Sequence, residues 1–227
     1  MKRFYKDVSV AGHDGAFQVH LDGKPLKTPS GVVLAIPARA LAEAVAREWH
    51  ETGATFDPQL LPLTRLAFAA AAPAQRARIV EQLIGFGRSD LLCYRAEAPA
   101  ALVARQAAAW DLLLDWVAET HGARLTVTSG IKFVPQPEAA LRALEVALEK
   151  RDDFSLAAIH AATPIAGSLV IGLALADGRL DAAEAFAAAH LDESFQAEQW
   201  GRDTEAEERL AGRRSELEAA ERFLRLL

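Results

Sequence analysis

The sequence predicts an α+β protein in which a small N-terminal β-rich domain of antiparallel strands precedes a larger, mainly α-helical C-terminal domain. Three observations support this fold class. Apolar and polar residues alternate over the first forty residues, which is the period of a half-buried strand. Beyond Pro58 the apolar residues recur at helical spacing, and alanine and leucine become abundant. A chain of 227 residues is long enough for two such units, and we predict domains at 1–58 and 59–227.

The N-terminal region predicts an antiparallel β meander. Its strand candidates lie at residues 8–10, 17–21 and 32–36. Asp, Gly and Pro residues separate these candidates, and they suit the special φ values that tight turns require. Pro37 then opens a helix that we predict over residues 38–52, before Gly53 ends it.

The remaining chain predicts a series of helices. Proline is tolerated in the first helical turn, where its missing N–H is not needed, so Pro137 and Pro164 mark two helix starts. Gly85 and Gly87 predict a helix end or bend before Ser89. A short hairpin with strands at 124–128 and 131–134 is expected to interrupt the series. We predict helices over residues 63–72, 74–86, 102–120, 138–150, 155–161, 164–176 and 182–200, and one more near the C-terminus.

Composition and charge exclude several function classes. The formal net charge is −6, and the basic residues are dispersed among acids, whereas a general nucleic-acid binder needs a basic field. Cys93 is the only cysteine, which rules out an internal disulfide and favours a reducing compartment. The N-terminus lacks the apolar segment of a signal peptide. The longest apolar stretch, residues 165–176, is too short to span a bilayer.

Catalytic sequence motifs are absent. The chain has no phosphate-binding loop, dinucleotide fingerprint, zinc-protease motif or nucleophile elbow. Its six histidines are scattered without ligand-like spacing. Cys93 lies among apolar residues, as a small buried hydrophobe does. Asp111 and Asp115 form an acidic pair at helical spacing, and both a solvated helix face and a carboxylate dyad fit this pattern.

The C-terminal segment is the most informative part of the chain. Wound as one helix, at about 100° per residue, it carries an apolar stripe made of Phe195, Leu210, Leu217, Leu224 and Leu227. Glu198 and Glu205 fall at one margin of the stripe, Asp192 falls at the other, and Trp200 points away from it. Acids at such margins are either solvated or part of a polar binding surface. Gly201 can interrupt this helix, and the residues before and after it would then not share one continuous helical face.

With these residues in place, the chain resembles the ATP12 family, chaperones for assembly of the F1 sector of ATP synthase. The resemblance covers nearly the full length. It implies a small N-terminal β-rich domain and a larger helical domain, as the periodicity also predicts. It further implies binding of the free F1 α subunit, shielding of the interface that faces the β subunit, and neither catalysis nor a cofactor. The segments that carry it are 21–29 (LDGKPLKTP), 44–49 (AVAREW), 61–66 (LPLTRL), 89–95 (SDLLCYR), 106–116, 167–173 (GSLVIGL) and 191–201 (LDESFQAEQWG).

The resemblance also implies a place for the client contact. An acidic residue after the Trp-Gly pair is needed for function in the family. Glu205 is the best match, and Asp203 or Glu207 fits with a shift of one or two residues. The stretch after Gly201 departs from the Trp- and His-containing stretch of mitochondrial members. We predict a client surface on the C-terminal helices, with Asp192, Glu193, Glu198, Asp203 and Glu205 as polar contacts and Trp200 as an anchor.

The resemblance bears on location as well. Mitochondrial members carry a targeting presequence, whereas this chain starts directly at its first strand. This favours a bacterial cytoplasmic protein, which we expect to be a monomer when free.

Two other functions also fit the sequence, those of an enzyme and of an adaptor. An enzyme would use the carboxylates of the C-terminal helices, or Asp111 with Asp115, as acid and base. Such an enzyme needs a concave pocket and a carboxyl group with a displaced pKa. An adaptor for another oligomer would share the chaperone's features.

Overall fold

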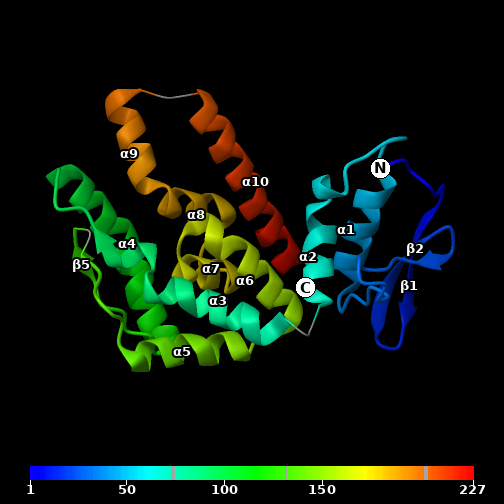
Figure 1. Ribbon diagram of the computed structural model, residues 1–227, viewed down its shortest axis with the longest axis horizontal. Coiled ribbons are helices and arrows are strands. Elements are labelled where there is room, and N and C mark those ends of the chain that lie inside the picture. Colours follow the sequence, from blue (N-terminus) through cyan, green and yellow to red (C-terminus); the bar gives the residue numbers. More distant parts are fainter. Residues whose placement is uncertain (73–74, 131, 202–203) are drawn as a thin grey trace.

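The computed structural model describes residues 1–72, 75–130, 132–201 and 204–227. It confirms the predicted fold class, because a small antiparallel sheet at the N-terminal end is followed by a larger helical region (Figure 1). The sheet lies at one end of the molecule beside helices α1 (Arg39–His50) and α2 (Pro62–Ala70), and the other helices form the larger part (Figure 1).

The N-terminal sheet has three antiparallel strands in the order β1 (Val8–His13), β2 (Ala16–Leu21) and β3 (Lys24–Pro25). Asp14 and Gly15 join the first two strands and both have positive φ, 48° and 79°, as the tight hairpin turn requires. The prediction of a strand at 32–36 is wrong. That segment folds back over the loop that follows β3, so it forms isolated bridges instead of a continuous ladder.

Glu48 connects α1 to α2. Its carboxylate accepts hydrogen bonds from the backbone N–H groups of Leu63 and Thr64, at 2.8 and 2.9 Å. The indole N–H of Trp49 donates to the Thr64 hydroxyl at 3.1 Å. Glu48 thus satisfies free N–H groups at the start of α2, where a negative charge is also favourable. The domain boundary predicted after residue 58 falls in the 3-10 turn Pro58–Leu60, just before α2, and it remains a prediction.

The larger region is built from helices α3 (Arg76–Arg88), α4 (Ala100–His121), α5 (Glu138–Glu149), α6 (Asp153–Ala166), α7 (Leu169–Ala176), α8 (Ala182–Ala189), α9 (Leu191–Trp200) and α10 (Thr204–Arg225). Pro164 does not begin a helix as predicted, because it lies in the last turn of α6. The break comes instead at Gly167, with φ 64°, and at Ser168, whose side chain caps α7. The single helix predicted over 182–200 is two helices, because the backbone at His190 is not helical.

The hairpin predicted within residues 124–134 is also wrong. In the described part of this stretch, β5 (Thr128–Ser129) pairs in parallel with β4 (Tyr94–Arg95). The side chain of Gln136 accepts from the N–H of Thr126 at 2.7 Å and donates to its carbonyl at 3.0 Å. A buried glutamine therefore satisfies the backbone groups that a second hairpin strand would have paired.

Two glycines allow helices to approach one another closely. The helix end predicted after Gly85 and Gly87, before Ser89, is confirmed, since α3 ends at Arg88. Gly87 faces α5, where an added Cβ would lie 3.1 Å from the Cδ1 atom of Leu144. Gly172 of α7 faces α6, and an added Cβ there would overlap the hydroxyl oxygen of Thr163. Because Thr163 is fully buried, the crossing of α6 and α7 has no room for a side chain at Gly172.

The C-terminal helix α10 joins two hydrophobic cores. The larger core lies among α3 to α8 and includes Leu217 of α10. The smaller core lies among the sheet, α1 and α2, and includes Phe223 of α10. Phe223 is fully buried, and its ring stacks on Phe154 of α6 with 6.0 Å between centroids and 8° between planes. Helix α10 therefore fastens the N-terminal region to the helical region.

Asp90 is a buried carboxylate that joins the 3-10 turn Leu91–Cys93 to the first turn of α7. It is 0 % exposed, and it accepts hydrogen bonds at 3.1 Å from the backbone N–H groups of Leu92 and Val170. Burial raises the pKa of the Asp90 carboxyl to about 6, against the lowering effect of its hydrogen bonds. Arg95, five residues further along the chain, forms an ion pair with Asp111 at 2.8 Å.

The raised pKa of Asp90 predicts that acidification stabilises the fold. The ordinary pKa of this carboxyl group is 3.8, and in the folded protein it is about 6. Between pH 3.8 and about pH 6, Asp90 therefore binds a proton more readily in the folded protein than in the unfolded chain. The stability that this proton contributes is present at low pH and is lost as the pH rises through the folded pKa. From pH 7 to pH 5, the free energy of unfolding should rise by about 1 kcal/mol more in the parent than in Asp90→Asn. Urea unfolding of both proteins at several pH values measures this, and a constant difference between them would contradict it.

Candidate functional site

Helices α9 and α10 form an arch on the helical region. The chain rises along α9, reaches Gly201 at the outer end and returns along α10 to the core (Figure 1). Gly201 ends α9 with φ 89°, a backbone conformation that favours glycine. Trp200, the last residue of α9, is 81 % exposed. The arch therefore presents an uncovered aromatic side chain at its outer end.

Helix α9 is attached to α4 largely by polar contacts. Among its residues, all of which are described, Phe195 is the buried one. The guanidinium of Arg105 on α4 lies 5.1 Å from the centre of the Phe195 ring and bonds to the carboxylate of Glu198 at 2.8 Å. This contact lowers the pKa of the Glu198 carboxyl. Both partners are about half exposed, at 49 % and 50 %, and such a pair contributes little to stability.

A second polar contact lies at the base of α9. The side chain of Gln106, which is 1 % exposed, donates to the carboxylate of Asp192 at 2.7 Å and accepts from the N–H of Ala96 at 2.8 Å. Asp192 lies in the first turn of α9, where a carboxylate interacts favourably with the helix dipole. Gln106 therefore fixes the start of α9 against α4.

A pocket of about 360 Å³ lies between the two arms of the arch, at their base. It is lined by Asp192, Glu193 and Gln196 from α9, by Arg213 from α10, by His190, and by apolar residues that include Leu91, Trp110 and Ile165. His190 is 2 % exposed, and neither of its ring nitrogens has a hydrogen-bond partner among the described residues. The Nδ1 atom of His190 lies 3.6 Å from the carboxylate of Glu193. The adjacent imidazole lowers the pKa of the Glu193 carboxyl.

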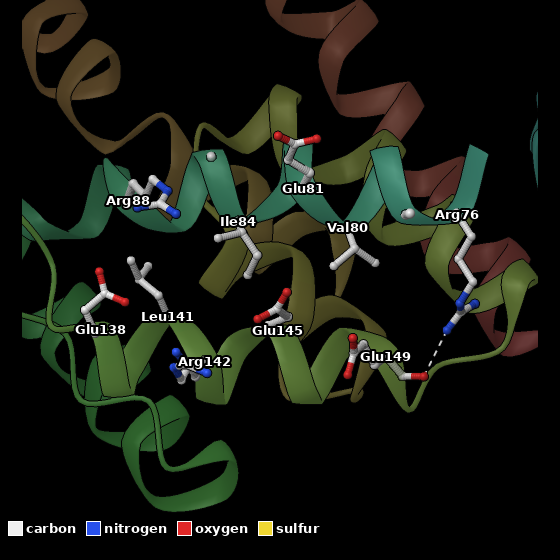
Figure 2. Close-up of a pocket in the computed structure, with 12 residues that line it drawn as sticks. Arg76, Val80, Glu81, Ile84, Arg88, Glu138, Leu141, Arg142, Glu145 and Glu149 are labelled. Atoms are coloured by element: carbon white, nitrogen blue, oxygen red, sulfur yellow. Dashed lines mark hydrogen bonds between the residues drawn. The ribbon is translucent and has the colours of Figure 1, made fainter. Parts of the chain in front are cut away.

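A larger groove, of about 700 Å³, runs between α3 and α5 (Figure 2). Val80 and Ile84 of α3 point toward α5 across it, and Leu141 of α5 points back (Figure 2). Arg76 closes one end by donating to the carbonyl of Glu149 at 2.9 Å. Its charged lining residues are Arg76, Arg88, Arg142, Glu81, Glu138, Glu145 and Glu149. Arginines and glutamates are interspersed along both helices, so the groove has no region of a single charge.

Comparison with known proteins identifies the family. The family model described as ATP12 chaperone protein matches residues 2–118, just over half of the chain. The chain belongs to the ATP12 chaperone family. It is 26 % identical over 221 residues to the mitochondrial protein atp12 of Schizosaccharomyces pombe, covering 91 % of this chain and 76 % of that protein.

Solved structures show the same relationship. The crystal structure of Atp12 from Paracoccus denitrificans superimposes with a TM-score of 0.92 at 42 % identity, covering 99 % of this chain and 97 % of that chain. A protein of Agrobacterium tumefaciens superimposes with a TM-score of 0.93 at 44 % identity, covering 99 % of this chain and 85 % of that chain. The ATP12 fold therefore extends over the whole chain, including the arch.

The structure separates the predicted contact residues on α9. Asp192 and Glu198 face α4, where they bond to Gln106 and Arg105, so part of their role is to hold α9 in place. Glu193 lines the pocket, and Trp200 is exposed to solvent. Contact of these residues with a client remains a prediction.

The predicted residues beyond Trp200 lie at the start of α10. Glu205 is exposed, and its carboxylate lies 3.4 Å from the guanidinium of Arg209, one turn further along the helix. Asp203 lies outside the described residues. The apolar stripe drawn for one continuous helix is divided between two, since Phe195 of α9 packs toward α4 and Leu217 of α10 lies in the larger core. The choice of Glu205 as the important acid remains a prediction.

Sequence reasoning did not find Arg105, Gln106 or His190 as parts of this site. Arg105 lies 93 positions from Glu198, and Gln106 lies 86 positions from Asp192. No local pattern pairs residues at such separations. His190 carried a weak signal, because it interrupts an alanine-rich helical pattern directly before the acidic segment.

The carboxylates give no support to the enzyme alternative. Asp111 and Asp115 are exposed on α4. The pKa values of Glu193 and Glu198 are lowered, which is opposite to the shift that a general acid needs near neutral pH. Burial raises the pKa of the Cys93 thiol to about 12, so this cysteine is not a thiolate nucleophile at neutral pH.

The described ranges contain neither a candidate metal site nor a membrane-spanning helix. There, no group of three His, Cys, Asp or Glu side chains is placed to hold a metal ion. The helices of the same ranges are too short or too polar for any of them to cross a bilayer.

Proposed function

We propose that this chain is an assembly chaperone for the F1 sector of ATP synthase, which binds the free α subunit and shields its β-facing interface until the β subunit takes over. Membership of the ATP12 chaperone family supports the chaperone role, and the family resemblance supplies the client. A subunit that waits for its partner exposes an apolar interface that is prone to aggregation. We place the protein in the bacterial cytoplasm as a monomer when free, with no nucleic-acid partner and no membrane insertion.

The uncovered outer end of the arch is the observation that carries this proposal. Trp200 is 81 % exposed, whereas Trp49 and Trp110 are 5 % and 1 % exposed. Tryptophan side chains commonly act as anchors that supply a large share of the binding energy at an interface. The exposed acid Glu205 lies close by in sequence at the start of α10. An apolar anchor with a polar surround suits a partner that must bind and later be released.

Co-purification with separately expressed F1 α and β subunits tests the proposal. The α subunit is expected to be retained, and the β subunit is not. The variant Trp200→Ala should weaken retention of the α subunit at least tenfold, because loss of an interface anchor costs about 2 kcal/mol or more. The matched control is Phe133→Ala, which removes another exposed aromatic side chain, 62 % exposed, outside the arch.

Three results would overturn this proposal in different ways. Retention of the β subunit alone would mean that the client is wrong, and retention of neither subunit would mean that the function is wrong. Equal loss of binding in Phe133→Ala and Trp200→Ala would mean that the arch is not the client surface.

A further inference from the structure

The net negative charge of the chain is concentrated in α9 and the start of α10. Residues 191–208 contain seven acidic residues and one arginine, a formal charge of −6, which equals the net charge of the whole chain. The rest of the sequence is therefore balanced. A charged surface of this kind attracts a partner of opposite sign and fixes how that partner is oriented.

One face of α9 connects the pocket to the outer end of the arch. Glu193 and Gln196 both line the pocket. Trp200 follows Glu193 by seven residues, which is close to two full helical turns, so both side chains lie on the same face about 10 Å apart along the axis. The inner face of α9 therefore carries an acidic group at its base and an aromatic side chain at its end.

The pocket itself combines apolar and acidic groups. Leu91, Trp110 and Ile165 supply apolar surface. The charged lining residues are Asp192, Glu193 and Arg213, so two carboxylates stand against one guanidinium in the charge balance of the pocket. The side chain of Glu193 is 53 % exposed, so one carboxylate is open to an incoming group. Long basic side chains fit such a lining, because they bury an apolar stem while their charged end reaches a polar partner.

His190 adds a hydrogen-bond acceptor that the described residues leave unused. The ring is 2 % exposed, yet neither nitrogen has a partner among those residues. A buried polar atom without a partner is unfavourable. In its neutral form, imidazole has one nitrogen that accepts a hydrogen bond, and a guanidinium or ammonium entering the pocket would donate one.

We propose that the pocket between α9 and α10 receives an arginine or lysine side chain of the client, while an apolar side chain of the same client segment packs against Trp200. This inference rests on the proposed function and specifies the chemistry of the client segment. The basic group pairs with Glu193, its stem lies against Leu91 and Ile165, and the apolar contact lies about 10 Å away along α9. The α3–α5 groove, with its interspersed charges, is not used.

The test measures the dissociation constant for the F1 α subunit in four proteins: the parent, Glu193→Lys, Gln196→Trp and Glu145→Lys. Glu193→Lys reverses the charge of the pocket, and Gln196→Trp fills it without changing charge. Glu145→Lys is the matched control, because it reverses an exposed acid in the α3–α5 groove. Each pocket variant is expected to raise the dissociation constant at least tenfold, and the control is expected to stay within twofold of the parent.

The outcomes separate this inference from the proposed function. Where the parent binds the α subunit, a Glu193→Lys variant with unchanged affinity overturns the inference alone. Equal loss in Glu145→Lys overturns it as well, because the effect is then one of overall charge. An unchanged Gln196→Trp variant does the same, because the pocket itself is then not occupied. A parent that binds no α subunit overturns the proposed function and this inference with it.

Discussion

Replacement of Phe223 by alanine is expected to lower the free energy of unfolding by about 4 kcal/mol, within the range for large-to-small changes at buried aromatic positions. Phe223 is fully buried and stacks on Phe154. The substitution removes this contact and leaves a cavity where α10 meets the N-terminal core. This loss of unfolding free energy should exceed that of an ordinary core residue, because Phe223 is also the residue of α10 that packs into the smaller core.

Urea unfolding followed by circular dichroism measures the effect of Phe223→Ala. The matched control is Leu227→Ala, two residues beyond the end of the same helix, where the side chain is 39 % exposed. The control should lose less than about 1 kcal/mol, since less apolar surface leaves water at that position. Similar losses in the two variants would mean that Phe223 does not join the two cores in the way its packing indicates.

The second large effect is expected at Gly172. The variant Gly172→Ala should lose about 2 kcal/mol of unfolding free energy, which is typical of overpacking, although alanine favours a helix interior by about 1 kcal/mol over glycine. The added methyl group would overlap the hydroxyl of Thr163 at the crossing of α6 and α7. Neither helix can easily move, because both are buried among the residues of the larger core.

A second substitution distinguishes this clash from a general loss of packing. The hydroxyl of Thr163 has no hydrogen-bond partner among the described residues, so Thr163→Ala should itself be mild. It removes the atom that meets the new methyl group. The double variant should therefore be more stable than the sum of the single effects predicts, by about 1 kcal/mol or more. Additive losses, or a Gly172→Ala variant as stable as the parent, would show that the clash is absent.

The sequence was sufficient for the fold class and for most elements with a strong period. Alternation identified the first two strands, and helical spacing identified α1, α4 and α5 close to their observed bounds. The errors occurred where tertiary contacts override local pattern. Pro164 is tolerated within α6 because it falls in the last turn, and Gln136 replaces a hairpin strand through its side chain. Neither arrangement has a local sequence signature.

The candidate site was partly predictable for the same reason. The density of acids around Trp200 is visible in the sequence, and the structure places this residue at the exposed end of an arch. The role of each acid was not visible. Asp192 and Glu198 are bound to residues of α4 that lie 86 and 93 positions away, and the pocket requires α9, α10 and the turn after α6 to come together. Such a juxtaposition exists only once the chain is folded.

The exposure of Trp200 also gives the protein a built-in optical reporter. Of its four tryptophans, Trp49 and Trp110 are buried, Trp116 is half-buried, and Trp200 alone is largely exposed to water. A neutral quencher such as acrylamide will therefore reach the indole at the end of the arch before the others. Covering of that indole by another molecule would reduce the quenching and shift the emission toward the blue. Occupancy of the arch can thus be followed in the native chain without a label.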